Sequence, residues 1–215
     1  AGVVATVSAM GDTTDDLIAL SRDVVGDTGP ANPRELDTLL STGELASAAL
    51  MAMAINARGQ KAISLSGIQA GVKTDAQHGS ARIAEIDTSR IREELDSGRI
   101  VIVAGFQGLS VSDDVTTLGR GASDLTAVAL AAALGAERCE IYTDVDGIYT
   151  TDPRFVPDAR KLNSIGYEEM LELASLGAKM NPRSIELASV YGVPVLVASS
   201  SEDLPGTMIE GERLP

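Results

Sequence analysis

Residues 99–147 read RIVIVAGFQGLSVSDDVTTLGRGASDLTAVALAAALGAERCEIYTDVDG, and this stretch decides the fold class. Its first ten residues are apolar and rich in β-branched side chains, which predicts a buried strand. A loop then leads to an alanine-rich run over 123–137, which predicts a helix that closes at Gly135. Residues 138–147 predict the next buried strand. A strand, a helix and a second strand in this order indicate a parallel sheet covered by helices.

The same alternation extends through the rest of the chain. Further strands are predicted over 1–11, 61–67 and 193–200. Further helices are predicted over 12–25, 34–59 with a short break inside, 88–98, 164–177 and 182–192, and residues 68–87 predict an irregular, partly β insertion. The pattern therefore predicts an α/β fold with a mostly parallel sheet, covered on both faces, in a single domain over residues 1–215.

Composition limits the partners of the chain. The formal charge of −14, the absence of Trp and an aromatic content of 3% argue against binding to nucleic acid or an anionic membrane. Cys139 is the only cysteine, so no internal disulfide forms, and the single His78 excludes a two-histidine metal site. We find no charged-then-apolar leader and no apolar run of about 18 residues, so we expect a cytoplasmic location.

Two candidate sites lie in the first fifth of the chain. Residues 8–14 (SAMGDTT) follow the first strand, and Thr14 with its neighbours could bind an anion at a helix N-terminus. A helix cap made by Asp12 or Thr13 explains the stretch about as well. Residues 41–44 (STGE) fit a capping box, and the alternative is that Glu44 binds a cation such as a substrate ammonium.

The stretch TLGRGASDLTA, residues 117–127, is a third candidate. Gly119 and Gly121 free the backbone on both sides of Arg120, whose forked guanidinium suits a carboxylate. Ser123 and Asp124 stand where the predicted helix begins, so Asp124 either caps that helix or binds an ammonium group. A glycine on each side of an arginine exceeds what a turn requires, and this favours a binding function.

A fourth candidate is TDVDGIYTTDPR, residues 143–154. Its acidic spacing resembles the start of a calcium loop, but Tyr149 and Phe155 stand where that loop needs glycine and glutamate. A nucleotide-binding loop fits better, with Tyr149 against a base and Arg154 on phosphate, and a polar turn remains the alternative.

Farther along, Lys179 could reach phosphate or be a solvated lysine. We find neither a Walker loop nor a Gly-x-Gly-x-x-Gly fingerprint after the first strand.

Taken together, these stretches resemble the catalytic domain of aspartate kinases, within the amino acid kinase superfamily. The resemblance rests on VSAMGDTTDDL, LLSTGE, SGIQAGVKTD, HGSARI, VAGFQG, the long block over 116–154 and GAK with PRSIELA, in the family's order. It implies a three-layer α/β/α sandwich with a mostly parallel central sheet. It also implies transfer of the γ-phosphoryl group of ATP to the β-carboxylate of L-aspartate, with Mg²⁺ carried by the nucleotide, in a homo-oligomer.

The resemblance also implies roles for individual residues. The residues implied to bind L-aspartate are Thr14, Glu44, Arg120, Ser123 and Asp124. The residues implied to bind the nucleotide are Thr143, Asp144, Tyr149, Asp152, Arg154 and Lys179. Catalytic roles fall to Asp124 and Lys179, and the protein supplies no metal site of its own.

The chain also departs from the family pattern. Family members open with a strand, a Lys-Phe-Gly-Gly-Thr-Ser-like loop and a helix, and residues 1–215 do not include them or the regulatory ACT-type domains. Leu45, Ala122 and Asn181 replace usual family residues. We therefore expect weak or no turnover from these residues alone. Two alternatives stay open: an amino acid kinase with another acceptor, and a non-catalytic module that binds nucleotide or amino acid.

Overall fold

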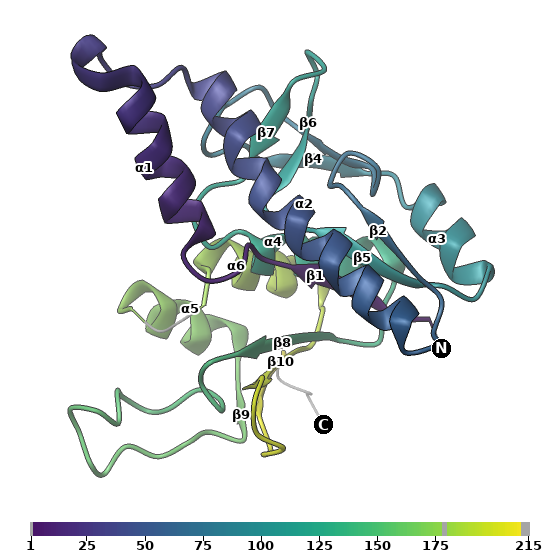
Figure 1. Ribbon diagram of the computed structural model, residues 1–215. Coiled ribbons are helices and arrows are strands. Elements are labelled where there is room, and N and C mark those ends of the chain that lie inside the picture. The colour runs from purple at the N-terminus through teal and green to yellow at the C-terminus, as the bar shows by residue number, and fades with distance from the viewer. Residues whose placement is uncertain (1, 178–179, 212–215) are drawn as a thin grey trace. The chain divides into compact units, whose positions relative to one another are not determined.

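The computed structural model describes residues 2–177 and 180–211. By its internal contacts the chain divides into two compact units, Ala1–Ala127 and Val128–Pro215, and the boundary falls inside helix α4 (Ser123–Leu134). Figure 1 shows the elements of both units. One domain can contain two such units, so the single-domain organisation stays a prediction.

The first sheet of unit 1 is parallel and has the order β1-β5-β2. It consists of β1 (Val4–Val7), β5 (Ile100–Ala104) and β2 (Ala62–Leu65). The central strand β5 is the apolar run of the sequence, and its residues from Val101 to Ala104 are fully buried. At the carboxyl ends of two neighbouring strands, Val7 of β1 pairs with Ala104 of β5.

Helix α2 (Pro33–Ala57) runs along this sheet, and α1 (Thr13–Val25) lies beside it (Figure 1). The predicted break within 34–59 is wrong, because α2 is continuous. Asn32 caps it, since its side chain accepts a hydrogen bond from the backbone N–H of Arg34. Gly43 explains why the helix tolerates glycine here: an added Cβ would lie 2.9 Å from Cβ of Ala9.

By length and composition alone, α2 could span a membrane, and 39% of its most apolar window is buried. Two features of its packing indicate a core helix of unit 1 instead. The helix contacts strands β1, β2, β5 and β7. It also buries the carboxylates of Asp37 and Glu44 against the protein, with exposed fractions of 1% and 4%.

The second sheet of unit 1 has the order β4-β3-β6-β7. It consists of β3 (Val72–Thr74), β4 (Ile83–Ile86), β6 (Gln107–Ser110) and β7 (Val115–Thr117), and α3 (Ser89–Asp96) follows β4 in the chain. The partly β character predicted for 68–87 is confirmed. The single strand predicted over 99–108 is wrong at its end, because β5 stops at Ala104 and β6 begins at Gln107. The loop predicted from there to residue 123 is wrong as well, because it contains the rest of the β6–β7 hairpin. Its strands are short and polar, and buried hydroxyls pair inside the sheet, as between Thr74 and Thr116 at 2.6 Å.

Unit 2 contains a mixed sheet of order β8-β10-β11-β9. Its strands are β8 (Cys139–Thr143), β9 (Ser164–Ile165), β10 (Val195–Ser199) and β11 (Thr207–Ile209), and α5 (Tyr167–Ser175) contacts α6 (Pro182–Tyr191). Strands β8 and β10 pair in parallel, as predicted, whereas β9 and β11 were not predicted as strands. The α/β class with parallel-rich sheets is confirmed.

Candidate functional site

The candidate substrate residues of unit 1 gather beyond the carboxyl ends of β1 and β5. The paired ends Val7 and Ala104 lead directly into the loop 8–12 and into Gly105. Parallel α/β sheets bind ligands at such ends, because loops from neighbouring strands meet there. Helices α1, α2 and α4 each bring candidate residues to these loops, as the following contacts show.

Glu44 contacts the β1–α1 loop from the middle of α2. Its Oε1 accepts a hydrogen bond of 3.1 Å from the backbone N–H of Ala9. Its Oε2 is buried and has no hydrogen-bond partner among residues 2–177 and 180–211. A buried carboxylate oxygen without a donor is costly, so such an atom suits a cationic ligand.

Burial raises the pKa of the Glu44 carboxyl, and the hydrogen bond from Ala9 offsets only part of that effect. The capping-box alternative for residues 41–44 is wrong, because Ser41 and Glu44 lie inside α2, whose N-cap is Asn32. The hydroxyl of Ser41 instead donates to the carbonyl of Thr38 at 2.8 Å. The cation-binding alternative therefore fits the geometry of Glu44.

A strained turn follows β5 and packs against the start of α4. Phe106 has a φ of 69°, which is unusual for a bulky residue and is typical of functional turns. Its backbone N–H donates to the buried hydroxyl of Thr126 at 3.1 Å, and that hydroxyl donates to the carbonyl of Ala122 at 3.1 Å. Gly105 allows the close approach, since an added Cβ would lie 3.0 Å from Oγ of Ser123.

The loop with Arg120 joins β7 to α4. Gly119 and Gly121 have φ values of 96° and 72°, which are conformations that favour glycine. The side chain of Arg120 is 82% exposed, and its guanidinium lies 3.3 Å from Oδ1 of Asp15 on α1. An exposed, long ion pair of this kind contributes little, so a bound carboxylate could replace Asp15.

The remaining candidates of unit 1 stand at helix starts. Thr14 is half-buried in the first turn of α1, next to Asp15, and Asp124 is half-buried beside Ser123 at the start of α4. The proposed cap of α1 is only partly as predicted. Asp12 occupies the N-cap position without a side-chain capping bond, and the hydroxyl of Thr13 donates to the carbonyl of Met10 at 2.6 Å.

In unit 2, the loop after β8 is held by a cluster of polar side chains. Lys161 lies 3.1 Å from Oδ2 of Asp146 and donates to the carbonyl of Pro205 at 2.7 Å. The hydroxyl of Tyr149 donates to the same carboxylate at 3.1 Å. Desolvation acts to raise the pKa of Asp146, but the hydrogen bonds from Lys161 and Tyr149 outweigh it and the pKa lies below its ordinary value. Desolvation and Asp146 raise the pKa of Tyr149.

The outer part of this loop carries its own ion pair. The guanidinium of Arg154 lies 2.7 Å from Oδ2 of Asp152, and the Arg154 side chain is 76% exposed. The hydrogen bonds from Arg154 lower the pKa of Asp152. At the end of β8, the hydroxyl of Thr143 donates to Asp144 at 3.1 Å. The last predicted nucleotide residue, Lys179, lies outside the described residues.

Within residues 2–177 and 180–211, no group of three or more His, Cys, Asp or Glu side chains is arranged to hold a metal ion. Magnesium in phosphoryl-transfer sites is often bound by only one or two carboxylates together with substrate phosphates. An ion carried mainly by the nucleotide is therefore compatible with these residues.

Sequence reasoning missed three residues that the structure brings into the candidate sites. They are Asp15, which contacts Arg120, Phe106, which makes the strained turn, and Lys161, which holds Asp146. The local motif Gly-Phe-Gln-Gly after a buried strand is a signal that could have indicated Phe106. Asp15 and Arg120 are 105 residues apart, and Lys161 and Asp146 are 15 apart, so neither pairing falls within one short motif.

Comparison with known proteins connects this geometry to a family. The sequence profile described as the amino acid kinase family matches residues 2–199. An aspartokinase of Geobacillus stearothermophilus is 57% identical over 211 residues, which cover 98% of this chain and 51% of that protein. The chain thus spans about half the length of the curated relatives that it matches.

Solved structures agree with that result. Aspartate kinase from Synechocystis superimposes with a TM-score of 0.84 and 48% identity, over 98% of this chain and 35% of that one. Aspartokinase III of E. coli, solved in complex with aspartate and ADP, gives a TM-score of 0.81 and 33% identity, over 94% of this chain and 46% of that one.

Proposed function

The chain belongs to the amino acid kinase family, and on that premise we propose that it phosphorylates the β-carboxylate of L-aspartate with ATP, giving 4-phospho-L-aspartate. The observation that carries the proposal is the buried, unpartnered Oε2 of Glu44 beside the carboxyl ends of β1 and β5. The name of the Geobacillus relative and the aspartate and ADP bound to the E. coli relative support it.

In this proposal, unit 1 binds the amino acid. Glu44 and Asp124 accept hydrogen bonds from the substrate ammonium, and Arg120 binds its α-carboxylate. Thr14 and Ser123 supply hydroxyl groups around the same ligand. An ammonium satisfies Oε2 of Glu44, because three N–H donors on a positive charge suit a buried carboxylate better than any neutral group.

In the same proposal, unit 2 binds ATP. Tyr149 packs against the base, Arg154 and Lys179 contact phosphate oxygens, and Thr143, Asp144 and Asp152 position these groups and the nucleotide. Magnesium bound to the nucleotide would neutralise charge on the phosphates, and the exposed carboxylate of Asp144 would contact it.

The reaction itself needs little proton chemistry. A β-carboxylate oxygen of aspartate forms a bond to the γ-phosphorus while the bond from that phosphorus to the β–γ bridging oxygen breaks, and ADP leaves. The attacking carboxylate is already ionised near neutral pH, so the site needs no strong general base. Positioning and positive potential supply most of the catalysis in such transfers.

We further propose that the protein acts in the cytoplasm as a homo-oligomer, at the entry to lysine and threonine biosynthesis.

The test is an assay that traps the acyl phosphate with hydroxylamine, with MgATP and L-aspartate as substrates. We expect aspartate-dependent hydroxamate from the protein that contains this chain, and much less from its Glu44→Gln variant at the same low aspartate concentration. Hydroxamate that forms with another acceptor but not with aspartate would favour a different amino acid kinase. Nucleotide binding without any turnover would favour a non-catalytic module.

A further inference from the structure

We propose that Asp37 is a positioning residue for the amino acid site of unit 1. Through His78, Gly79 and Thr117, its buried carboxylate holds the loop with Arg120 in place relative to the helix with Glu44. The inference rests on the proposed function, because it assigns Arg120 and Glu44 to one substrate. Asp37 itself touches no substrate in this proposal.

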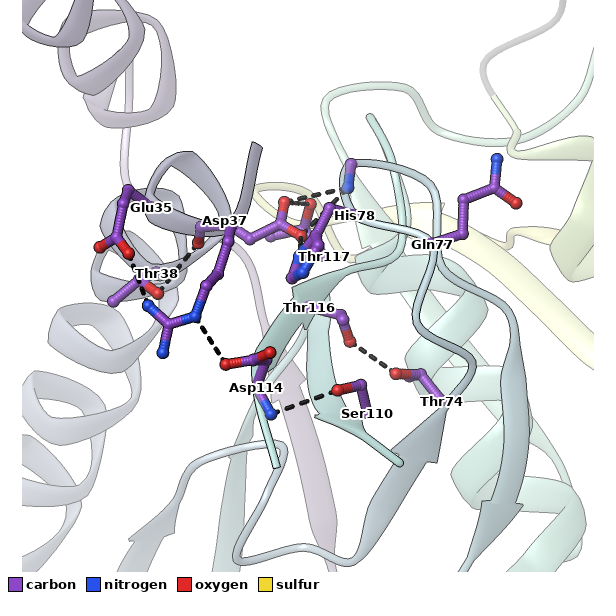
Figure 2. A network of polar contacts seen from close by, with 12 residues as sticks. Glu35, Asp37, Thr38, Thr74, Gln77, His78, Ser110, Asp114, Thr116 and Thr117 are labelled. Carbon is purple, nitrogen blue, oxygen red and sulfur yellow. Dashed lines mark hydrogen bonds and ion pairs between the residues drawn. The ribbon is translucent and has the colours of Figure 1, made fainter. Parts of the chain in front are cut away.

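Asp37 is 1% exposed and accepts hydrogen bonds on both carboxylate oxygens (Figure 2). Its Oδ1 lies 2.6 Å from the hydroxyl of Thr117 and 3.1 Å from the backbone N–H of Gly79. Its Oδ2 lies 2.7 Å from Nδ1 of His78 and 3.0 Å from the same N–H. A carboxylate only accepts hydrogen bonds, so the Thr117 hydroxyl, the Gly79 N–H and Nδ1 of His78 all donate to Asp37.

One side of this network is the helix that bears Glu44. Asp37 and Glu44 both belong to α2 and are seven residues apart, which is about two helical turns, so they share a face. Both side chains are buried, with exposed fractions of 1% and 4%. Any shift of α2 that breaks the contacts of Asp37 therefore also moves Glu44.

The other side of the network is the loop that bears Arg120. Thr117 ends β7, three residues before Arg120, and its carbonyl accepts a hydrogen bond of 2.9 Å from the N–H of Ala81. A Cβ added to Gly119 would lie 3.6 Å from the carbonyl oxygen of Gly79. The turn that contains His78 and Gly79 thus lies directly against the backbone that leads into Arg120.

A second tie between α2 and the β6–β7 hairpin supplies a matched control. Arg34 on α2 lies 2.6 Å from Oδ1 of Asp114, at the turn of that hairpin, and the Arg34 side chain is 51% exposed. This pair joins the same elements as the Asp37 network, but not at the loop with Arg120. If Asp37 acts only by fixing the hairpin to α2, loss of the Asp114 contact should have a similar effect.

The experiment compares Thr117→Val with Thr117→Ser, because both fit the site and only serine keeps the hydroxyl that donates to Asp37. We expect Thr117→Val to raise the KM for aspartate about tenfold, which is the scale of one hydrogen bond to a charged group. The KM for ATP should stay within about twofold of wild type, as for an interaction that only the amino acid site uses. Thr117→Ser and Asp114→Ala should resemble wild type for both substrates, and Asp37→Asn should resemble Thr117→Val.

A second readout does not depend on aspartate. Trypsin cleaves after exposed arginine, so a loosened loop should be cut faster at Arg120 in Thr117→Val and Asp37→Asn than in wild type or Thr117→Ser. An unchanged aspartate KM, or an equal rise in both KM values, in Thr117→Val would overturn the inference. If Asp37→Asn does not fold, the Thr117 pair decides alone. If wild type does not use aspartate, the proposed function is wrong, and the rate of cleavage then decides whether Asp37 orders the loop.

Discussion

The amino acid site of unit 1 and the nucleotide loop of unit 2 differ in how their charged side chains are buried and paired. In unit 1, Glu44 is buried and keeps one oxygen without a partner. In unit 2, Arg154 is exposed and pairs with Asp152, while Lys161 pairs with Asp146. A buried carboxylate with an unsatisfied oxygen is preformed for a cation, whereas the exposed Arg154 must exchange its carboxylate partner when a phosphate binds. Substitutions in the amino acid site of unit 1 should therefore have much larger effects than substitutions in the nucleotide loop of unit 2.

The largest effect should come from Glu44→Gln. The substituted amide keeps an oxygen for the N–H of Ala9 but cannot bind an ammonium by charge. We expect the KM for aspartate to rise about 100-fold, since loss of one partner from a buried charge pair costs about 2–5 kcal/mol. The KM for ATP should change by no more than about twofold, as expected if only amino acid binding is lost. Steady-state kinetics with each substrate varied in turn measures both values.

Glu85→Gln is the matched control for this substitution. Glu85 lies on β4 and its side chain is 63% exposed, where it pairs with Lys73. The same chemical change there should leave both KM values at wild-type levels. Equal rises in the two KM values of Glu44→Gln would contradict the role of Glu44 and point to a damaged fold.

Arg120→Ala should have the next largest effect. In the proposed site the forked guanidinium pairs with the substrate α-carboxylate. Asp15 holds this guanidinium only by a long contact of 3.3 Å, so little is lost when the substrate replaces Asp15. Loss of the guanidinium should therefore raise the KM for aspartate about tenfold, as for a charge-assisted hydrogen bond. Arg120→Lys should recover only part of the loss, because lysine is a point charge without the planar fork. The measurement is the ratio of the two KM values, and equal effects on aspartate and ATP would rule out the carboxylate role.

The sequence could predict features that have a local pattern, but not features that depend on contacts between distant segments. Strands β1, β5, β8 and β10 were predicted because each contains the apolar and β-branched residues that are typical of strands. The continuous α2 was missed because Gly43 suggests a break, and only the loop that approaches it shows why glycine is needed. The network of Asp37 with His78 joins residues that are 41 apart, so its signal exists only in the fold. Glu44 was predicted as a candidate, but its burial came from the structure.

The pH dependence of aspartate binding should differ from the pH dependence of stability, because the ionised Glu44 favours binding and lowers the stability of the fold without ligand. Burial raises the pKa of Glu44 above its ordinary value of 4.5, and only the ionised form suits an ammonium. As pH falls through the raised pKa, the KM for aspartate should therefore rise, by about tenfold per unit at the limit. Glu44→Gln should show only the smaller rise that comes from protonation of aspartate itself, so the difference between the two proteins reports Glu44.

Stability without ligand should show the opposite trend. Because the pKa of Glu44 is higher in the folded than in the unfolded chain, its contribution to stability is fully present below 4.5 and is lost as pH rises through the folded pKa. The denaturation midpoint of wild type should thus fall relative to Glu44→Gln as pH rises through that window. Parallel trends in stability and aspartate binding would show that the raised pKa does not belong to Glu44.

The smallest effect should come from Arg154→Ala in unit 2. Arg154 already pairs with Asp152 in water, so a phosphate gains only the difference between two exposed ion pairs, which is about 0–1 kcal/mol. We expect the KM for ATP to rise about threefold at low salt and less at high salt, because salt screens exposed charges. Arg138→Ala is the control, since Arg138 is an exposed arginine of unit 2 that pairs with Glu140. A loss for Arg154→Ala as large as that for Glu44→Gln would mean that the nucleotide loop is preformed after all, and that the contrast between the two units is wrong.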